Sequence, residues 1–151
     1  MRNLMTSDEQ ALLPENPMTG QPLKNGKPVD LKVRTKQFAL RVIRLFNSLP
    51  KANLVANVVG RQLLRSGTSV GANYRAACRA RSSRDFCAKM GLVEEEADES
   101  AYWMELLVEA GLVREELLGE LLAEANELVA IVVASIKTAR RSAQGGKHRG
   151  H

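Results

Sequence analysis

The sequence predicts an all-α protein folded as an antiparallel up-down-up-down four-helix bundle. Its apolar residues are mainly Leu, Val and Ala, which together favour helix over strand, and aromatic residues are few. All five prolines lie at or before Pro50, so no proline interrupts a helix in the rest of the chain. Apolar residues recur there at helical spacing, and 151 residues are enough for one domain with a proper core.

Composition divides the chain into a bundle and two tails. Residues 1–30 are rich in Pro, Gly, Asn and Asp and lack periodicity, which predicts a flexible N-terminal tail with turns and no strands. Residues 31–140 carry the helical pattern and are expected to form the four-helix bundle. Residues 141–151 are basic and Gly-rich and are expected to be a disordered C-terminal tail.

The first helix is expected from about Leu31 or Thr35 to Ser48, and Pro50 marks its end. Its apolar stripe consists of Phe38, Val42, Leu45, Phe46 and Leu49. Their spacing matches one face of a helix. The pattern therefore predicts a helix that buries this stripe and exposes the basic residues on its other side.

The second helix is expected to begin near residues 51–53 and to fade at Arg81 or Ser82. Gly67 and Gly71 raise the alternative of a break, because a glycine costs about 1 kcal/mol relative to alanine in a helix interior. A continuous helix is favoured, since both halves share one phase of apolar and basic residues. Small residues at these positions would then let another backbone approach closely.

At about 100° per residue, this second helix separates cationic from apolar side chains. One face carries the guanidinium groups of Arg61, Arg65, Arg75 and Arg79. The opposite face is apolar or small and is formed by Val55, Val59, Leu63, Ser66, Val70, Tyr74 and Ala77. The pattern predicts a helix that packs inward and presents a row of positive charge outward.

Two further helices complete the predicted bundle. Ser83 is expected to cap the third helix, with Asp85 in its first turn, and Gly111 to end it after about Ala110. The fourth helix is expected to cover about residues 115–139. Its apolar surface is wider than one partner groove covers, which predicts contacts between subunits.

Charge is strongly segregated along the chain. Residues 1–90 hold 16 basic and 5 acidic side chains, residues 91–127 hold 1 basic and 12 acidic, and residues 128–151 hold 5 basic and none acidic. This pattern predicts basic helices beside acidic ones. Charge pairing within and between subunits and a dedicated nucleic-acid surface explain it equally well.

Three strings carry a resemblance to a known family. Residues 62–90 read QLLRSGTSVGANYRAACRARSSRDFCAKM, residues 95–107 read EEADESAYWMELL, and residues 30–50 read DLKVRTKQFALRVIRLFNSLP. These strings resemble the bacterial four-helix-bundle proteins named for intervening sequences in 23S ribosomal RNA genes. The resemblance covers roughly Asp30 to Ala139.

The resemblance implies a left-handed antiparallel bundle that assembles as a ring-like homopentamer. It also implies kinship with the accessory variability proteins of diversity-generating retroelements, which are pentamers that bind a reverse transcriptase and nucleic acid. Family members often carry an acidic residue where this chain has Ala76 and a lysine where it has Glu95, so this chain is more polarised. The family has no settled biochemical role, and the resemblance by itself implies no activity.

The basic row predicts binding of RNA or DNA through the phosphate backbone, without reading of bases. The residues expected to make these contacts are Arg61, Arg65, Arg75, Arg79, Arg81 and Arg84. The predicted function is that of a non-enzymatic homopentamer that binds nucleic acid, for example as an accessory to a reverse transcriptase. The alternative is a protein–protein interaction scaffold whose arginines form salt bridges between helices and subunits, with no nucleic acid.

A second group of polar residues is expected to form a structural network rather than a catalytic site. It consists of Gln62, Ser66, Ser69, Asn73, Glu96, Glu99 and Trp103. Glu96 and Glu99 are expected to pair with arginines of the second helix. A catalytic serine needs a general base, and the only histidines, His148 and His151, lie in the tail. No catalytic residue, metal or cofactor is predicted, because metal sites in bundles combine carboxylates and histidines from facing helices.

Cysteine usage and hydropathy predict a cytoplasmic protein with no membrane partner. Cys78 and Cys87 form no CxxC unit and are expected to be small buried thiols in a reducing compartment. The N-terminus lacks the apolar segment of a signal peptide. The longest apolar run, Leu128 to Ala134, is too short to span a bilayer.

Overall fold

The computed structural model describes residues 23–24, 27–28 and 30–146. These residues form two short strands and four helices: β1 (Leu23–Lys24), β2 (Lys27–Pro28), α2 (Leu31–Ser48), α3 (Leu54–Ala77), α4 (Ser83–Glu109) and α5 (Glu115–Gly145). We expected a flexible N-terminal tail and a disordered C-terminal tail. Most residues of both tails lie outside the described residues.

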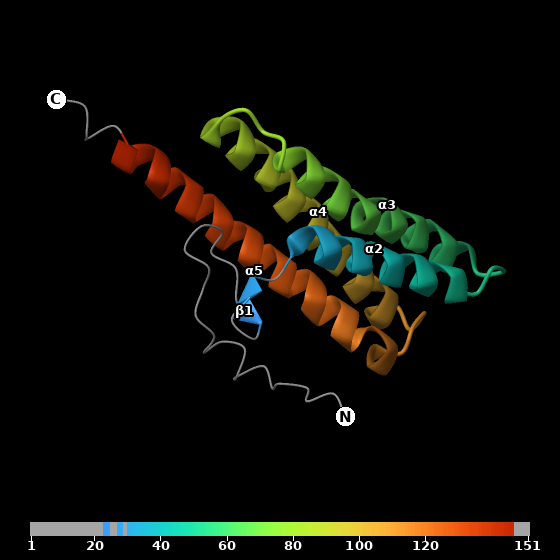
Figure 1. The fold of residues 1–151 in the computed structure, drawn as a ribbon. Helices are drawn as coiled ribbons and strands as arrows, with labels where there is room; N and C mark the ends of the chain where they lie inside the picture. The colour runs from blue at the N-terminus through green and yellow to red at the C-terminus, as the bar shows by residue number, and fades with distance from the viewer. Residues whose placement is uncertain (1–22, 25–26, 29, 147–151) are drawn as a thin grey trace.

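The four helices pack in chain order, each antiparallel to the one before it (Figure 1). Packing is most extensive between α3 and α4, followed by α4 with α5 and α2 with α3, whereas α2 and α5 meet sparsely. The predicted all-α fold of four sequentially antiparallel helices is confirmed. Because the helices alternate in direction, the α3–α4 turn and the C-terminal end of α5 lie at the same end of the bundle (Figure 1).

The prediction that the chain lacks strands is wrong for one short segment. β1 and β2 pair antiparallel, with Leu23 opposite Pro28 and Lys24 opposite Lys27. The sequence contains a signal for this pairing, since Asn-Gly is a strong β-hairpin dipeptide and the chain reads Asn25-Gly26 between the two strands.

Polar side chains cap the starts of three helices. The Lys32 amide donates to Asp30 Oδ1 (2.9 Å) at α2, the Ala56 amide to Asn53 Oδ1 (3.0 Å) at α3, and the Asp85 amide to Ser82 Oγ (3.0 Å) at α4. The prediction of Ser83 as the α4 cap is therefore off by one residue. Ser82 has the extended backbone of an N-cap, and Ser83 is already helical.

α3 is one continuous helix through Gly67 and Gly71, as predicted. A Cβ added at Gly67 would lie 2.8 Å from Val42 Cγ2, and one added at Gly71 would lie 3.2 Å from Thr35 Oγ1. Both glycines therefore lie where α2 crosses close to α3. Glycine lowers the stability of a helix, but here it is needed because a side chain at either position would hold α2 away from α3.

α3 ends at Ala77, earlier than the predicted Arg81 or Ser82. Cys78 is the C-cap, and the next two amides make i to i−3 bonds, from Arg79 to Ala76 O (3.1 Å) and from Ala80 to Ala77 O (3.0 Å). The chain has to leave the helix here because Ser82 adopts an extended conformation to cap α4. Arg79 and Arg81 therefore lie in a turn and not on the helical row.

α4 ends as Gly111 predicts. Gly111 has φ +71°, its amide donates to Val108 O (2.9 Å), and the Leu112 amide donates to Leu107 O (3.0 Å). This pattern is a Schellman motif, which requires a left-handed residue and so favours glycine.

α5 continues past the predicted end at Ala139 to Gly145. Residues 140–144 include no proline or glycine that would stop a helix. Residues 141–145, assigned to the disordered tail from the sequence, are thus helical, and Arg141 lies on α5.

The core consists of apolar side chains contributed by all four helices. Its largest fully buried members include Phe38 of α2, Leu63 of α3, Met104 of α4 and Leu128 of α5. Val55, expected in this core, is 56% exposed because it lies in the first turn of α3 at the edge of the buried face. Among the helices that the structure describes, none combines the length and hydropathy needed to cross a membrane.

Candidate nucleic-acid interface

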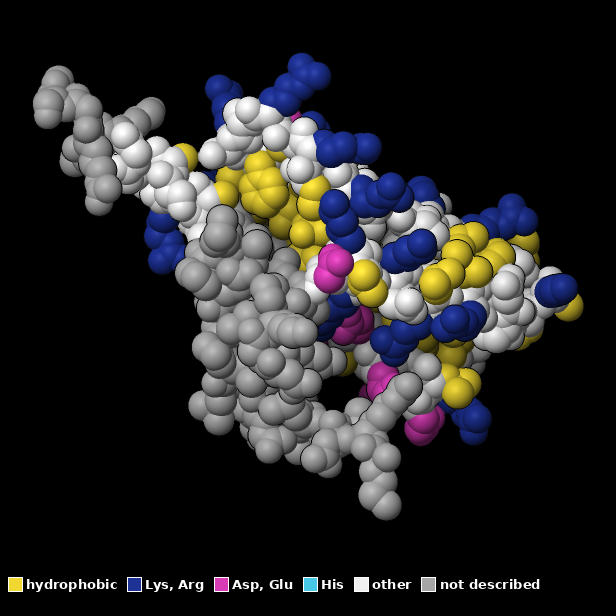
Figure 2. Space-filling view, in the orientation of Figure 1, with side chains coloured by type: hydrophobic (Ala, Val, Ile, Leu, Met, Phe, Trp, Pro, Cys, Tyr) yellow, Lys and Arg dark blue, Asp and Glu magenta, His cyan; other side chains and the backbone are white. Residues whose placement is uncertain are grey.

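The structure distributes the six predicted nucleic-acid-binding arginines over three elements. Arg61, Arg65 and Arg75 lie on α3, Arg79 and Arg81 lie in the α3–α4 turn, and Arg84 lies in the first turn of α4. All six are exposed. Figure 2 shows Lys and Arg side chains around this turn and along α3. The residues do not form one straight row, because α3 ends before Arg79.

Arg65 is neutralised by carboxylates of the same chain. Its Nη1 lies 3.3 Å from Glu96 Oε2, and its Nη2 forms a second salt bridge with Glu99 Oε1. The indole nitrogen of Trp103 also donates to Glu99 Oε1 (3.0 Å). The hydrogen bond to Arg65 lowers the pKa of Glu99 below its ordinary value of 4.5. The predicted pairing of Glu96 and Glu99 with the second helix is therefore confirmed, and Arg65 is less available to a phosphate.

Two further arginines lie near the C-terminal end of α5, at the same end of the bundle as the α3–α4 turn (Figure 1). Arg140 and Arg141 of α5 are exposed near its C-terminal end, and Arg140 lines a cleft together with Arg84. We call this surface the basic end, and it consists of Arg75, Arg79, Arg81, Arg84, Arg140 and Arg141. The contribution of α5 was not predicted, because most of the positive charge after residue 127 was assigned to a tail.

Carboxylates are scarce at the basic end. Residues 75–89 and 139–146 together hold seven basic side chains and one acidic side chain, Asp85. That carboxylate is occupied, since Lys89 Nζ lies 2.8 Å from Asp85 Oδ2, and this hydrogen bond lowers the pKa of Asp85. Within residues 30–146, Arg75, Arg79, Arg84 and the two α5 arginines form no salt bridge. Their positive charge is therefore available to an external anion.

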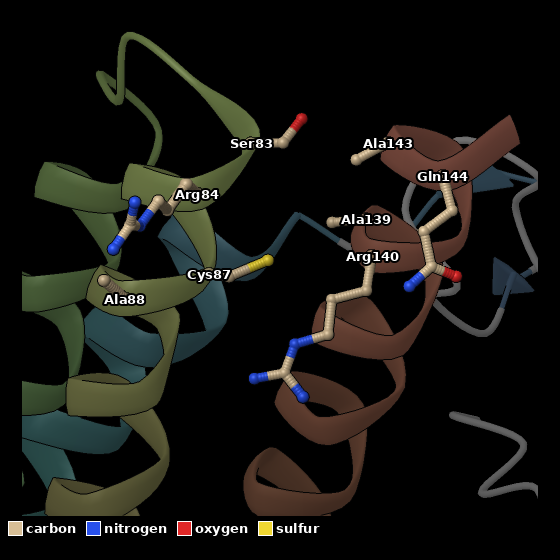
Figure 3. Close-up of a pocket in the computed structure, with 8 residues that line it drawn as sticks. All are labelled: Ser83, Arg84, Cys87, Ala88, Ala139, Arg140, Ala143 and Gln144. Atoms are coloured by element: carbon tan, nitrogen blue, oxygen red, sulfur yellow. The ribbon is translucent and has the colours of Figure 1, made fainter. Parts of the chain in front are cut away.

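A cleft of about 440 Å³ opens between the start of α4 and the end of α5. It is lined by Ser83, Arg84, Cys87, Ala88, Ala139, Arg140, Ala143 and Gln144. In Figure 3 the thiol of Cys87 points across the gap toward α5, Arg140 and Gln144 extend from α5, and Arg84 extends away from α5. The lining of the cleft thus combines small apolar side chains with two arginines and two polar side chains.

The predicted polar network is brought together only in part. Ser66 is buried, and its Oγ lies 3.0 Å from the Oγ of Ser100, a residue that sequence analysis did not single out. Ser69 bonds locally to Arg65 O (2.7 Å). Gln62 is exposed, Asn73 is half-buried, and within the described part of the chain neither side chain forms a hydrogen bond. The paired serines join α3 to α4 in the core.

A second ion cluster, which the sequence did not indicate, joins α2 to α5. Arg34 Nε lies 2.6 Å from Glu124 Oε1, and Arg34 Nη2 lies 2.8 Å from Glu127 Oε2. Burial alone would lower the pKa of Arg34, but the hydrogen bonds and charges of both glutamates outweigh burial and raise it. This cluster links the two helices that otherwise meet sparsely.

The described residues include no group of three or more His, Cys, Asp or Glu side chains arranged to hold a metal ion. His148 and His151 lie outside the described residues. Both cysteines are free thiols. The prediction that both are buried is wrong for Cys78, which is exposed because α3 ends one residue before it; Cys87 is half-buried.

Comparisons with known proteins agree with this architecture. A crystal structure of a protein of unknown function from the S23 ribosomal protein family of Bacteroides thetaiotaomicron VPI-5482 matches with a TM-score of 0.64 and 32% sequence identity, covering 71% of this chain and 98% of that one. No curated protein matches the chain. Residues 29–134 match the family described as 23S rRNA-intervening sequence protein. The chain therefore belongs to the 23S rRNA-intervening sequence protein family.

Proposed function

We propose that this protein is a non-enzymatic nucleic-acid-binding protein that contacts backbone phosphates through its basic end. The observation that supports the proposal is a group of exposed arginines at the meeting point of α3, α4 and α5, with one nearby carboxylate that is already paired. Arginine binds phosphate in a bidentate way, and contacts of this kind supply most of the non-specific affinity of proteins for nucleic acid.

The proposed assembly is a homopentamer, as the family resemblance implies. Large apolar side chains are exposed on all four helices and offer surface for subunit contacts; they include Val33, Leu54, Leu92, Tyr102 and Leu117. Five copies of the basic end could bind one long polyanion at the same time, which would make the pentamer bind it more tightly than a single subunit does. The family names refer to 23S rRNA and to a ribosomal protein, which makes RNA the first ligand to test. A reverse transcriptase is the proposed protein partner, again from the resemblance.

Salt dependence tests the phosphate contacts. If the six arginines of the basic end each neutralise one phosphate, log K for a single strand should fall with log salt at a slope of about −4 per protomer. Affinity for a uridine oligonucleotide is measured by fluorescence anisotropy over a salt series. Binding that is equal at low and high salt, or absent from purified protein, contradicts the proposal.

A protein-interaction scaffold is the second candidate, and the Arg65 pairs with Glu96 and Glu99 favour it. These pairs show that at least one arginine of α3 balances charge within the protein. In this alternative, further arginines would pair with the acidic α4 and α5 of a neighbouring subunit.

Charge reversal at the basic end separates the two candidates. Arg75→Glu/Arg79→Glu is compared with Lys51→Glu/Arg114→Glu, which alters two exposed cations at the opposite end of the bundle. Oligomer mass is measured by gel filtration with light scattering, and RNA binding by gel shift. An intact oligomer that loses RNA binding only in the first variant supports the nucleic-acid proposal. Loss of the oligomer in that variant supports the scaffold instead.

A further inference from the structure

We propose that the cleft between α4 and α5 receives one unstacked base of a nucleic-acid strand, so that the preferred ligand is single-stranded. The inference rests on the proposed function, since the cleft opens within the basic end. It goes further, because phosphate contacts alone would hold a duplex and a single strand alike.

The lining of the cleft suits the flat face of a base. Its walls include the methyl groups of Ala88, Ala139 and Ala143 and the side chain of Cys87, which points into the gap (Figure 3). Its volume of about 440 Å³ lies in the range of pockets that bind small organic ligands, about 300–1,000 Å³. Small side chains on both helices keep the space open, as stacking of a planar ring requires.

Polar groups beside these walls suit the edge of a base. Gln144 and Ser83 line the cleft and can each donate and accept hydrogen bonds, and Arg140 offers a planar guanidinium. Single-stranded RNA is commonly recognised by bases that stack on aromatic rings or arginine planes and hydrogen-bond through their edges. Among the described residues, those that line the cleft include no aromatic side chain, so the guanidinium of Arg140 is the expected stacking partner of the base.

The surrounding charges suit the phosphates on either side of that base. Arg79 and Arg81 lie in the turn before α4, and Arg84 extends from α4 away from the gap (Figure 3). Arg141 follows Arg140 in the sequence of α5 and is exposed about 100° further round the helix. A strand crossing the cleft from α4 to α5 would therefore meet cations before and after the inserted base. A duplex keeps its bases stacked inside and could fill the cleft only by flipping one out.

Filling the cleft tests the inference. Ala139→Leu/Ala143→Leu places larger side chains in it, and Ala123→Leu/Ala130→Leu makes the same change on an exposed part of α5 as a matched control. Leucine and alanine are both good helix formers, so the helix content should be retained. The first variant is expected to bind a single-stranded uridine oligonucleotide about tenfold more weakly, because one stacked base is lost. The control and all duplex affinities should be unchanged.

The outcomes separate this inference from the proposed function. If the filled variant binds the single strand as well as the natural protein does, the base-binding inference is overturned and the phosphate contacts stand. If the natural protein binds neither ligand, both proposals are overturned.

The thiol of Cys87 gives a second readout that does not depend on the filled variant. Cys78→Ser removes the exposed thiol and leaves Cys87 as the reporter. Addition of the single strand is expected to slow alkylation of Cys87 by iodoacetamide several-fold, whereas the duplex is expected to leave the rate unchanged. Equal protection by both ligands contradicts insertion of a base.

Discussion

The close contact between α2 and α3 predicts that Gly67→Ala makes the protein less stable, although alanine has a higher helix propensity than glycine. Gly67 lies inside α3, where alanine is intrinsically favoured by about 1 kcal/mol. An added Cβ would lie 2.8 Å from Val42 Cγ2 and 2.9 Å from Val42 Cγ1. Val42 is β-branched and fully buried, so its side chain has little freedom to move aside.

Two other glycines provide the control. Gly91 of α4 and Gly119 of α5 are also helical, and an added Cβ meets nothing within 4 Å. Alanine at either position should raise the free energy of unfolding by about 0.5–1 kcal/mol. Overpacking at Gly67 costs about 1–3 kcal/mol, which exceeds the propensity gain. The expected result for Gly67→Ala is a net loss of about 1 kcal/mol, and thus a gap of nearly 2 kcal/mol from the controls.

The measurement is urea denaturation followed by circular dichroism at one fixed protein concentration, because any assembly makes stability depend on concentration. If Gly67→Ala gains as much stability as Gly91→Ala, the close approach of Val42 does not explain the glycine. Such a result would mean that α2 can move away from α3 at no cost.

Two more predictions follow from the ion pairs. Arg34→Met should lower the free energy of unfolding by about 2–3 kcal/mol, because it leaves a largely buried Glu124 without its partner; this value lies between those for exposed and fully buried ion pairs. Urea denaturation measures the loss, and Lys36→Met, which removes an exposed cation of α2, is the control. Equal losses in the two variants would contradict the prediction. Glu99→Gln should destabilise the protein most at neutral pH. Because Arg65 lowers the folded-state pKa of Glu99, its stabilisation is complete above the ordinary pKa of 4.5 and is lost as the pH falls through the folded-state value. Denaturation of both proteins over a pH series should therefore show their difference shrinking in acid, and a difference that grows in acid would refute the assignment.

The helices were predictable because their signals are local. Apolar residues at helical spacing, Pro50 at the end of α2 and Gly111 at the end of α4 each indicate one element without knowledge of the rest. The continuity of α3 was also predictable, since the apolar phase on both sides of Gly67 agrees. The pairing of Glu96 and Glu99 with α3 followed from opposite charge on neighbouring antiparallel helices.

Features that depend on three-dimensional register were not predictable. The end of α3 depends on whether Ser82 or Ser83 caps α4, and both residue types suit the position equally. The Arg34 cluster joins residues that are 90 positions apart, so no periodic pattern reveals it. The basic end required knowing that α5 extends past Ala139 and returns to the level of the α3–α4 turn.

The antiparallel register itself explains why positive charge remains unpaired at one end. Apart from Asp85, which pairs with Lys89, the acidic residues of α4 begin at Glu94, so they reach Arg65 in the middle of α3 but not the arginines at its end. Favourable interaction with a helix C-terminus would account for Arg75, which lies in the last turn of α3. It does not account for Arg84, because a cation in the first turn of α4 opposes the helix dipole. Arg84 should therefore cost a little stability, and the external anion that we propose for the basic end would account for Arg84 together with Arg79 and Arg140.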